Sequence, residues 1–159
     1  MESLISALSL EPNIEGGFFR QTFESAACVE VKGRRLPLMN TIYYLLTQGS
    51  PVGYFHRNKH DITHFYHLGR GAHYLLISPE GGLKEVTLGP DLAAGQCLSF
   101  TAPGGCWKSS HLAPGAEFCL ISEVVSPGFD YADHEMASLA GFAADFPHLL
   151  ERIKDYVRP

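Results

Sequence analysis

Short apolar runs, rich in β-branched and aromatic residues, alternate along this chain with clusters of Gly and Pro. Gly49-Ser50-Pro51, Pro103-Gly104-Gly105 and Pro127-Gly128 are among these clusters. Short runs between such turn signals are typical of an all-β sandwich or barrel, and a set of this size suits a jelly roll. We expect strands over residues 18–23, 40–47, 53–57, 62–68, 73–77, 84–88, 97–101, 107–112 and 117–125.

Helical patterns lie at the two ends of the chain. Ser3–Leu8 is short and apolar, and we expect it to cover an edge of a sheet. Near the C-terminus, apolar residues recur every three or four positions around Pro147, which suits a first helical turn. These residues are Phe146, Leu149, Leu150, Ile153 and Val157. The helix they predict should pack against the outside of the barrel. His134–Ala140 suggests another helix, with Asp130 or, in preference, Asp133 as its cap.

Length and composition fit a single domain over residues 1–159, with a barrel at about 15–126 and a C-terminal helical segment at about 134–157. The 12 Lys and Arg against 17 Asp and Glu provide no positive field, so neither nucleic acid nor a membrane is expected as a partner. The first residues lack a secretion signal, and no apolar stretch approaches the roughly 20 residues that span a bilayer. We therefore expect a cytoplasmic protein.

Two segments keep the spacing of a two-part metal-binding motif. The first holds His56, Asn58 and Ile62, and the second holds Pro103-Gly104-Gly105 followed by Lys108. This layout resembles the cupin superfamily, whose motifs read G-x5-H-x-H-x3-4-E-x6-G and G-x5-7-P-x-G-x2-H. The resemblance implies that His56 stands at the first histidine ligand, Asn58 at the second, Ile62 at the glutamate and Lys108 at the last histidine. One of the four ligands is therefore kept.

Longer stretches resemble the fifth cupin family, a group of small domains of unknown function. They read Glu15-Gly16-Gly17-Phe18-Phe19-Arg20, Ile42-Tyr43-Tyr44-Leu45-Leu46, His64-Phe65-Tyr66 and Ser126-Pro127-Gly128-Phe129-Asp130-Tyr131-Ala132-Asp133. In that family the segment His60–Phe65 usually reads Asp-Glu-x-Trp-His-Phe, so Ile62 and Thr63 are departures. The resemblance implies a cupin jelly-roll barrel that forms a homodimer, because related small cupins pair through strand exchange or sheet packing.

The resemblance also indicates which side chains face the barrel interior, since successive strand residues point to opposite faces. If His56 faces inward, Tyr54 does too. The glutamate position of the motif is inward, which implies that Ile62, His64 and Tyr66 face the cavity as well.

On the strand at 107–112 the same step places Lys108 inside and Trp107 on the outer face. Histidine, tyrosine and lysine together suit acid-base chemistry, because imidazole titrates near neutral pH, phenol exchanges a proton and ammonium stabilises an oxyanion. Polar residues satisfied within a packed barrel are the alternative interpretation. Arg20 could hold a carboxylate or phosphate, or form a surface salt bridge, and Phe129 is a further candidate ligand contact.

No metal cofactor is expected. Asn58 is a poor ligand, Ile62 offers none and Lys108 repels a cation, and a catalytic site usually needs three protein ligands. His64 could add a second imidazole to His56, so a divalent metal at these two residues stays open. The four cysteines contain no C-x-x-C pair, which argues against a zinc knuckle or a redox site.

The predicted function is binding of a small molecule. The leading hypothesis is a metal-independent isomerase, epimerase or lyase acting on a sugar or nucleotide-sugar derivative, by similarity to sugar-nucleotide epimerase cupins. His56 or His64 would be the base, Tyr66 or Tyr54 the acid, and Lys108 would stabilise an enolate. The alternatives are a non-catalytic binding module and a metal-dependent oxygenase using His56 and His64.

Overall fold

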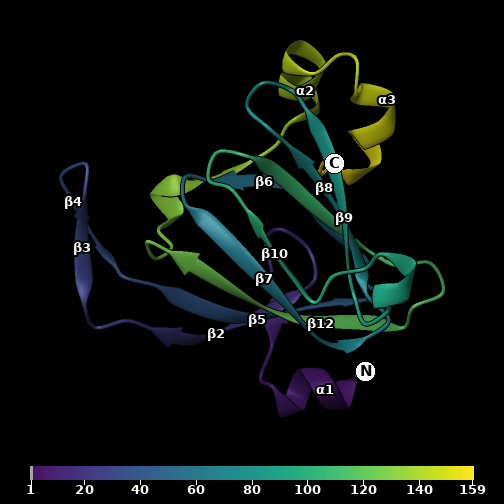
Figure 1. Ribbon diagram of the computed structural model, residues 1–159, viewed down its shortest axis with the longest axis horizontal. Coiled ribbons are helices and arrows are strands. Elements are labelled where there is room, and N and C mark those ends of the chain that lie inside the picture. Colours follow the sequence, from purple (N-terminus) through teal and green to yellow (C-terminus); the bar gives the residue numbers. More distant parts are fainter. Residues whose placement is uncertain (1) are drawn as a thin grey trace.

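Two antiparallel sheets face each other and form a flattened barrel (Figure 1). The structure, a computed structural model, describes residues 2–159. One sheet has the strand order β1 (Glu11–Pro12), β2 (Phe18–Glu24), β5 (Asn40–Thr47), β12 (Phe118–Ser126), β7 (Asp61–Gly69) and β10 (Ser99–Ala102). The other has the order β13 (His134–Met136), β6 (Val52–Asn58), β11 (Trp107–Leu112), β8 (Ala72–Ile77) and β9 (Leu83–Leu88). A separate hairpin of β3 (Cys28–Val31) and β4 (Arg34–Pro37) projects to one side.

The predicted all-β jelly roll is confirmed. Every strand expected from the sequence is present, and its ends shift by at most two residues. Short strands without an apolar run were not foreseen. The strand β13 is the most important of these, because it replaces the first part of the helix predicted over His134–Ala140. Its backbone extends the sheet by pairing His134 with Asn58 and Met136 with His56, and this pairing overrides the local helical pattern.

Apolar side chains fill one end of the barrel interior and leave the other end to polar groups. Strands β5 and β12 run side by side and show the division. Tyr44 lies opposite Ile121 within the buried apolar cluster, whereas Ile42 lies opposite Glu123 further along. The remaining members of this cluster are Leu46, Ala72, Tyr74, Leu88 and Cys119. The polar end of the barrel is therefore the place to look for a site.

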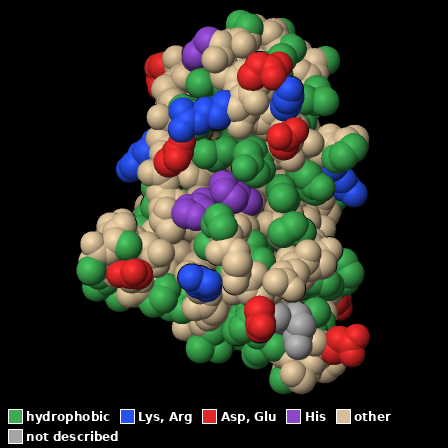
Figure 2. All heavy atoms as spheres, turned by 90° about the vertical axis from the view of Figure 1, so that its right-hand side faces the viewer, with side chains coloured by type: hydrophobic (Ala, Val, Ile, Leu, Met, Phe, Trp, Pro, Cys, Tyr) green, Lys and Arg blue, Asp and Glu red, His purple; other side chains and the backbone are tan. Residues whose placement is uncertain are grey.

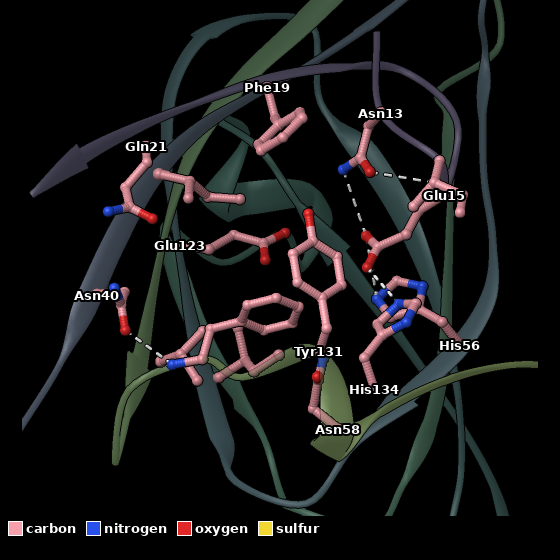
Figure 3. A pocket seen from close by; sticks show the side chains of 15 residues that line it. Asn13, Glu15, Phe19, Gln21, Asn40, His56, Asn58, Glu123, Tyr131 and His134 are labelled. Carbon is pink, nitrogen blue, oxygen red and sulfur yellow. Dashed lines mark hydrogen bonds and ion pairs between the residues drawn. The ribbon is translucent and has the colours of Figure 1, made fainter. Parts of the chain in front are cut away.

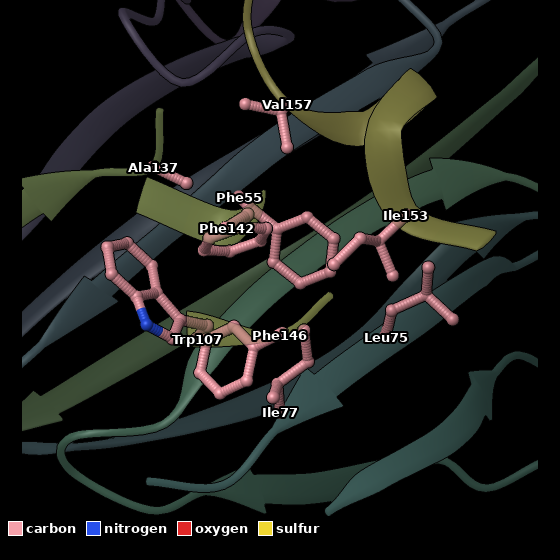
Figure 4. Close-up of a cluster of buried hydrophobic side chains, with 9 residues drawn as sticks. All are labelled: Phe55, Leu75, Ile77, Trp107, Ala137, Phe142, Phe146, Ile153 and Val157. Carbon is pink, nitrogen blue, oxygen red and sulfur yellow. The ribbon is translucent and has the colours of Figure 1, made fainter. Parts of the chain in front are cut away.

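The C-terminal segment covers the outer face of the five-stranded sheet, as predicted (Figure 4). It is not one continuous helix. The helix α2 (Leu139–Asp145) begins at Ser138, whose side chain accepts a hydrogen bond from the Gly141 amide, and it ends before Pro147. The chain then forms α3 (Leu150–Ile153) and the 3-10 turn η3 (Lys154–Tyr156). The buried cluster beneath consists of Phe55, Leu75, Ile77, Trp107, Ala137, Phe142, Phe146, Ile153 and Val157. Trp107 thus faces outward, as alternation predicted.

The N-terminal helix α1 (Glu2–Ala7) lies on the six-stranded sheet. Leu4 and Ile5 pack against Leu45 and Leu120, so the helix covers part of the outer face rather than only an edge. A second 3-10 turn, η1 (Leu92–Ala94), follows β9, and a third, η2 (Tyr131–Asp133), precedes β13. None of the helices within residues 2–159 combines the length and the apolar character needed to cross a bilayer.

Candidate functional site

The polar end of the barrel holds a cavity of about 120 Å³, well beyond the space that a single water molecule needs (Figure 3). Its walls come from β2, β5, β6, β7 and β12 and from the segments around residues 14 and 131. The lining residues are Asn13, Ile14, Glu15, Phe19, Gln21, Asn40, Ile42, His56, Asn58, Ile62, Glu123, Val125, Phe129, Tyr131 and His134.

This lining combines apolar surface with amides, carboxylates and imidazoles. It contains two carboxylates, Glu15 and Glu123, and two imidazoles, His56 and His134. Among residues 2–159, no Lys or Arg lines the cavity. The cavity therefore offers many hydrogen-bond acceptors but no cation with which to clamp a phosphate or carboxylate.

The Glu15 carboxylate contacts both imidazoles (Figure 3). Its Oε1 is 2.8 Å from His134 Nε2, and its Oε2 is 3.3 Å from His56 Nε2. The two rings stack, with centroids 5.5 Å apart. Because an ionised carboxylate only accepts, His134 Nε2 donates to Glu15.

A tight turn places Glu15 in this position. The Glu15 amide donates to Asn13 Oδ1, and the Glu15 carbonyl accepts from the Tyr54 amide. The next residue, Gly16, has φ of +96°, and a Cβ there would lie 2.1 Å from the Val52 carbonyl oxygen. Only glycine fits at that point, which explains the Glu-Gly sequence.

The proton on His56 is fixed by its neighbours. His56 Nδ1 lies 2.8 Å from the Tyr54 carbonyl oxygen, which can only accept, so Nδ1 carries a hydrogen. Within the described chain, His56 Nε2 is buried and has no hydrogen-bond partner. In the neutral ring this nitrogen presents a lone pair beside the Glu15 oxygen.

Burial shifts the pKa values of this group. It lowers the pKa of His56, and the Glu15 charge only partly offsets that effect. Burial alone would raise the pKa of Glu15, but His56 and the hydrogen bond from His134 hold it below its ordinary value. Glu15 is therefore ionised and His56 neutral at neutral pH, and a proton taken up by His56 would form an ion pair with Glu15.

A second polar cluster, which we call the lysine cluster, consists of Lys108, His64 and Glu123. Lys108 Nζ lies 2.9 Å from His64 Nε2 and 3.3 Å from Glu123 Oε2. Lys108 is 4% exposed and His64 is 0% exposed. Of the three, Glu123 alone lines the cavity.

The lysine cluster is held in one charge state by its own contacts. Burial would raise the pKa of Glu123, but the Lys108 ammonium and His64 bring it well below its ordinary value. Burial and the Lys108 charge both lower the pKa of His64. The cavity floor therefore carries a fixed carboxylate, with a neutral imidazole and an ammonium behind it.

The segment from Phe129 to His134 forms one side of the cavity mouth. The Phe129 amide donates to Asn40 Oδ1 at 2.7 Å, and Tyr131 is 72% exposed. Figure 3 shows Tyr131 between the Glu123 side and the Glu15 side of the cavity. Phe129, a candidate ligand contact from the sequence, lines the cavity, and so does Tyr131, whose phenol was not foreseen.

Arg34, from the β3–β4 hairpin, holds the segment 129–134 in place through ion pairs. Its guanidinium contacts Asp130 at 2.5 Å and the buried Asp133 at 2.6 Å, and Lys59 reaches Asp133 at 2.8 Å. Asp133 was expected to cap a helix, but its side chain instead forms ion pairs with Arg34 and Lys59. The cap belongs to Asp130, whose side chain accepts from the Ala132 amide at the start of η2.

His64 and Lys108, which were expected in the cavity, lie beneath its floor and do not line it, and three further candidates lie elsewhere. Tyr54 does not line the cavity because a bulge in β6 shifts the alternation of its side chains. Lys108 pairs with His56, so in a regular ladder Ser110 would pair with Tyr54, but it pairs with Gly53. The Tyr66 hydroxyl donates to the Gly69 carbonyl oxygen, away from the cavity lining.

Arg20 is the third of these residues. Its neighbours Phe19 and Gln21 line the cavity, whereas the Arg20 guanidinium lies over the Tyr43 ring on the other face of the sheet. The structure therefore separates Arg20, Tyr54 and Tyr66 from the cavity in which they were expected.

The residues present do not fit the metal that the cupin motif implies. Asn58 offers one neutral oxygen and Ile62 none, and Lys108 directs its ammonium at the imidazole that could have served as a further ligand. Over residues 2–159, no three His, Cys, Asp or Glu side chains are grouped as a metal site. The donor chemistry, rather than the spacing, departs from the motif.

Comparisons with known proteins agree on the fold. The family model described as Cupin superfamily (DUF985) matches residues 2–137. An uncharacterized protein of Saccharomyces cerevisiae, YML079W, is 40% identical over 148 residues, covering 84% of this chain and 73% of its own length.

Solved structures give the same result. A hypothetical protein from Leishmania major has a TM-score of 0.93 at 32% identity, with 99% of this chain and 98% of that chain covered. A protein from Shewanella oneidensis has a TM-score of 0.91 at 35% identity, with 99% and 97% covered. A Bacillus subtilis oxalate decarboxylase mutant has a TM-score of 0.56 at 15% identity, with 91% of this chain and 36% of its own chain covered, which supports the fold alone.

Proposed function

The chain belongs to the cupin superfamily, in the family DUF985, and we propose that its barrel is an acid-base enzyme of the isomerase, epimerase or lyase class. The observation that carries this proposal is the lone pair of His56 Nε2, buried, unpartnered within residues 2–159 and 3.3 Å from the Glu15 carboxylate. Such a nitrogen can accept a proton from a bound molecule, and Glu15 stabilises the imidazolium that results. No metal ion is needed for this step.

The lining supports a small hydroxylated substrate without a phosphate. Substrate hydroxyl groups can donate hydrogen bonds to Glu123 and His56. The side-chain amides of Asn13 and Gln21 can act toward these hydroxyl groups as donors or as acceptors. A nucleotide sugar would need cations for its diphosphate, and no Lys or Arg of the described chain lines the cavity. We therefore favour a simple sugar or related hydroxy-carbonyl compound over a nucleotide-sugar derivative.

In the proposed reaction, His56 Nε2 removes a proton from the carbon beside a carbonyl group. The electron pair left behind moves to the carbonyl oxygen. The side-chain amide of Asn58 donates a hydrogen bond to that oxygen. Tyr131 then donates a proton to the opposite face of the carbon, and the proton on His56 returns to Tyr131 through solvent at the mouth. Tyr131 thus takes the acid role first given to Tyr66 or Tyr54, and His56 keeps the role of base.

Non-catalytic binding is the second candidate. The exposure of Tyr131 favours it, because a phenol open to solvent is a poorly confined acid. Incubation of the protein with a mixture of small sugars, followed by NMR of the sugar released from it, would separate the two. Conversion of the retained sugar to an isomer supports the enzyme, whereas a sugar returned unchanged after long incubation supports a binding module.

We also propose a homodimer formed through the uncovered part of the six-stranded sheet. Phe65 and Leu68 of β7 are large apolar side chains that remain 39% and 52% exposed. A Phe65→Glu variant should then be monomeric by sedimentation equilibrium while the wild type is dimeric. A monomeric wild type at micromolar concentration would contradict the dimer.

A further inference from the structure

The Glu15 carboxylate is a largely buried charge without a lysine or arginine beside it. Its Oε1 accepts a hydrogen bond from His134 Nε2, and Asn13 Nδ2 reaches its Oε2 at 3.5 Å, the limit of a hydrogen bond. Among residues 2–159, the ion-pair contacts of Glu15 are with His56 and His134 alone. A buried charge is normally paired with an opposite charge, so this carboxylate is suited to a cation that the ligand brings.

Two hydrogen-bond acceptors lie side by side at this point of the cavity. Glu15 Oε2 is 3.3 Å from His56 Nε2, which presents its lone pair because the hydrogen of the ring is on Nδ1. Within the described chain, His56 Nε2 is buried and has no hydrogen-bond partner. Because a buried acceptor without a hydrogen is unfavourable, a ligand that directs hydrogens at both atoms is favoured. Two neighbouring atoms of one small molecule can do this.

The rest of the lining also favours a positive ligand. Glu123 adds a second carboxylate, and because Lys108 balances its charge, the charge of Glu15 is left over. Three aromatic rings, whose faces attract cations, line the same cavity, and they belong to Phe19, Phe129 and Tyr131. Among the described residues no Lys or Arg lines the cavity, so a carboxylate or phosphate on the ligand would find no partner. The lining thus suits a cation without an acidic group.

We propose that the cavity binds small amino-carbonyl compounds, such as a hexosamine, in the ammonium form. The ammonium donates to Glu15 Oε2, and the hydrogen on the carbon that carries the ammonium faces His56 Nε2. Proton removal by His56 then takes place at that carbon, and the electron pair moves to the neighbouring carbonyl oxygen. A proton from Tyr131 on the opposite face gives the epimer at the same carbon. The positive charge beside the carbon stabilises the electron pair as it forms.

This inference rests on the proposed function for the reaction at carbon, but the class of ligand is tested by binding alone. If a hexosamine binds selectively and its carbon-bound hydrogen does not exchange in D₂O, the ligand class stands and the enzyme proposal fails. If neutral sugars exchange and hexosamines bind no more tightly than they do, the enzyme proposal stands and the ligand class fails.

The experiment is a calorimetric titration of wild type at about pH 6.5, where such an amine is protonated. Glucosamine, galactosamine and mannosamine are each compared with the parent hexose and with the N-acetyl derivative. We expect at least one hexosamine to bind about tenfold more tightly than its parent, because charge-assisted hydrogen bonds are about twice as strong as neutral ones. The N-acetyl derivative keeps an N–H group but loses the charge, so it should lose the gain.

Glu15→Gln keeps the size of the side chain and removes its charge. This variant should bind the hexosamine no more tightly than the parent hexose, whereas the exposed Glu117→Gln should keep the preference of wild type. Circular dichroism checks that both variants are folded, and the three-way comparison in wild type decides the question if Glu15→Gln is not. The inference is overturned if no hexosamine binds wild type more tightly than its parent and its N-acetyl derivative, or if folded Glu15→Gln keeps the full preference.

Discussion

Two carboxylates of the cavity have opposite surroundings. Glu15 contacts two imidazoles at 2.8 and 3.3 Å, whereas Glu123 contacts the Lys108 ammonium at 3.3 Å as well as the His64 imidazole at 3.4 Å. Glu15 can therefore respond when His56 gains or loses a proton, but Glu123 keeps its charge throughout. This difference assigns proton transfer to the Glu15 side and a fixed negative charge to the other.

Glu15→Gln tests whether Glu15 supports a charged His56. Burial lowers the pKa of His56 and the Glu15 charge raises it, so removing the charge should lower this pKa further. Titration of the imidazole signals by NMR measures the change, with the exposed Glu117→Gln as the matched control. An unchanged or higher pKa for His56 would contradict the ion-pair interpretation.

Glu123→Gln tests the lysine cluster. The change leaves the Lys108 ammonium buried without its carboxylate, and breaking a buried pair in this way typically costs about 3–5 kcal/mol. We expect a loss of this size in the free energy of unfolding, measured by urea denaturation, whereas Glu117→Gln should stay within about 0.5 kcal/mol of wild type. A loss below about 1 kcal/mol for Glu123→Gln would show that the cluster contributes little.

At the level of single residues, the sequence identified some of the buried polar groups and missed others. Alternation from the cupin frame buried His56, His64 and Lys108 as expected. Glu123 was overlooked although it interrupts the apolar run 118–125, where a buried carboxylate requires a partner. His134 was overlooked because it was read as part of a helix, and its approach to Glu15 joins residues far apart in the chain.

Local irregularities in the elements decide which side chains reach the cavity. The bulge in β6 keeps His56 inside and removes Tyr54, and no feature of the sequence marks it. The segment 129–134 closes one side of the mouth because Arg34 from the β3–β4 hairpin holds Asp130 and Asp133. The hairpin therefore acts on the site without lining it.

Arg34→Ala should loosen the cavity mouth. The guanidinium is the only group of the described residues that contacts both Asp130 and Asp133. Without it, we expect faster amide hydrogen exchange in residues 129–134 by mass spectrometry, with little change in β5 and β12. Arg35→Ala, exposed on the same hairpin, is the control. Equal exchange in both variants would rule out this role for Arg34.

The whole molecule buries histidines and carboxylates whose pKa values shift in the acid direction. Burial lowers the pKa of His56, His64 and His111, the last to about 4. Contacts with cations or imidazoles outweigh burial and lower the pKa of Glu15, Glu123 and Asp133, the last to about 2. In each case the unfolded chain binds protons at a pH where the native chain does not.

Stability should therefore fall on acidification in two stages. Below the ordinary histidine value of 6.5 the unfolded state gains protons on the three histidines, and below about 4.5 it gains them on the carboxylates. Urea denaturation at about pH 7.5, 5.5 and 3.5 measures both stages, and His111→Gln should reduce the first. Equal or greater stability at about pH 5.5 than at 7.5 would contradict the assignment.

The barrel as a whole was more predictable than its ends. Strand periodicity and turn signals identified the main strands because both depend on local sequence. The C-terminal helix was placed against the correct face but breaks around Pro147, and β13 forms only because an edge of β6 is available to pair. Such pairing depends on distant segments, so a local pattern cannot reveal it.

The most direct test of the account is exchange of carbon-bound hydrogen in D₂O. Wild type, His56→Gln and the outer-face control Thr63→Ala are incubated with a panel of small hydroxy-carbonyl sugars and followed by NMR. The account predicts exchange beside the carbonyl of at least one sugar with wild type and Thr63→Ala, and a rate about 10²–10⁴-fold lower with His56→Gln, the usual contribution of a general base. No exchange above buffer with any sugar, or equal rates with and without His56, would contradict it.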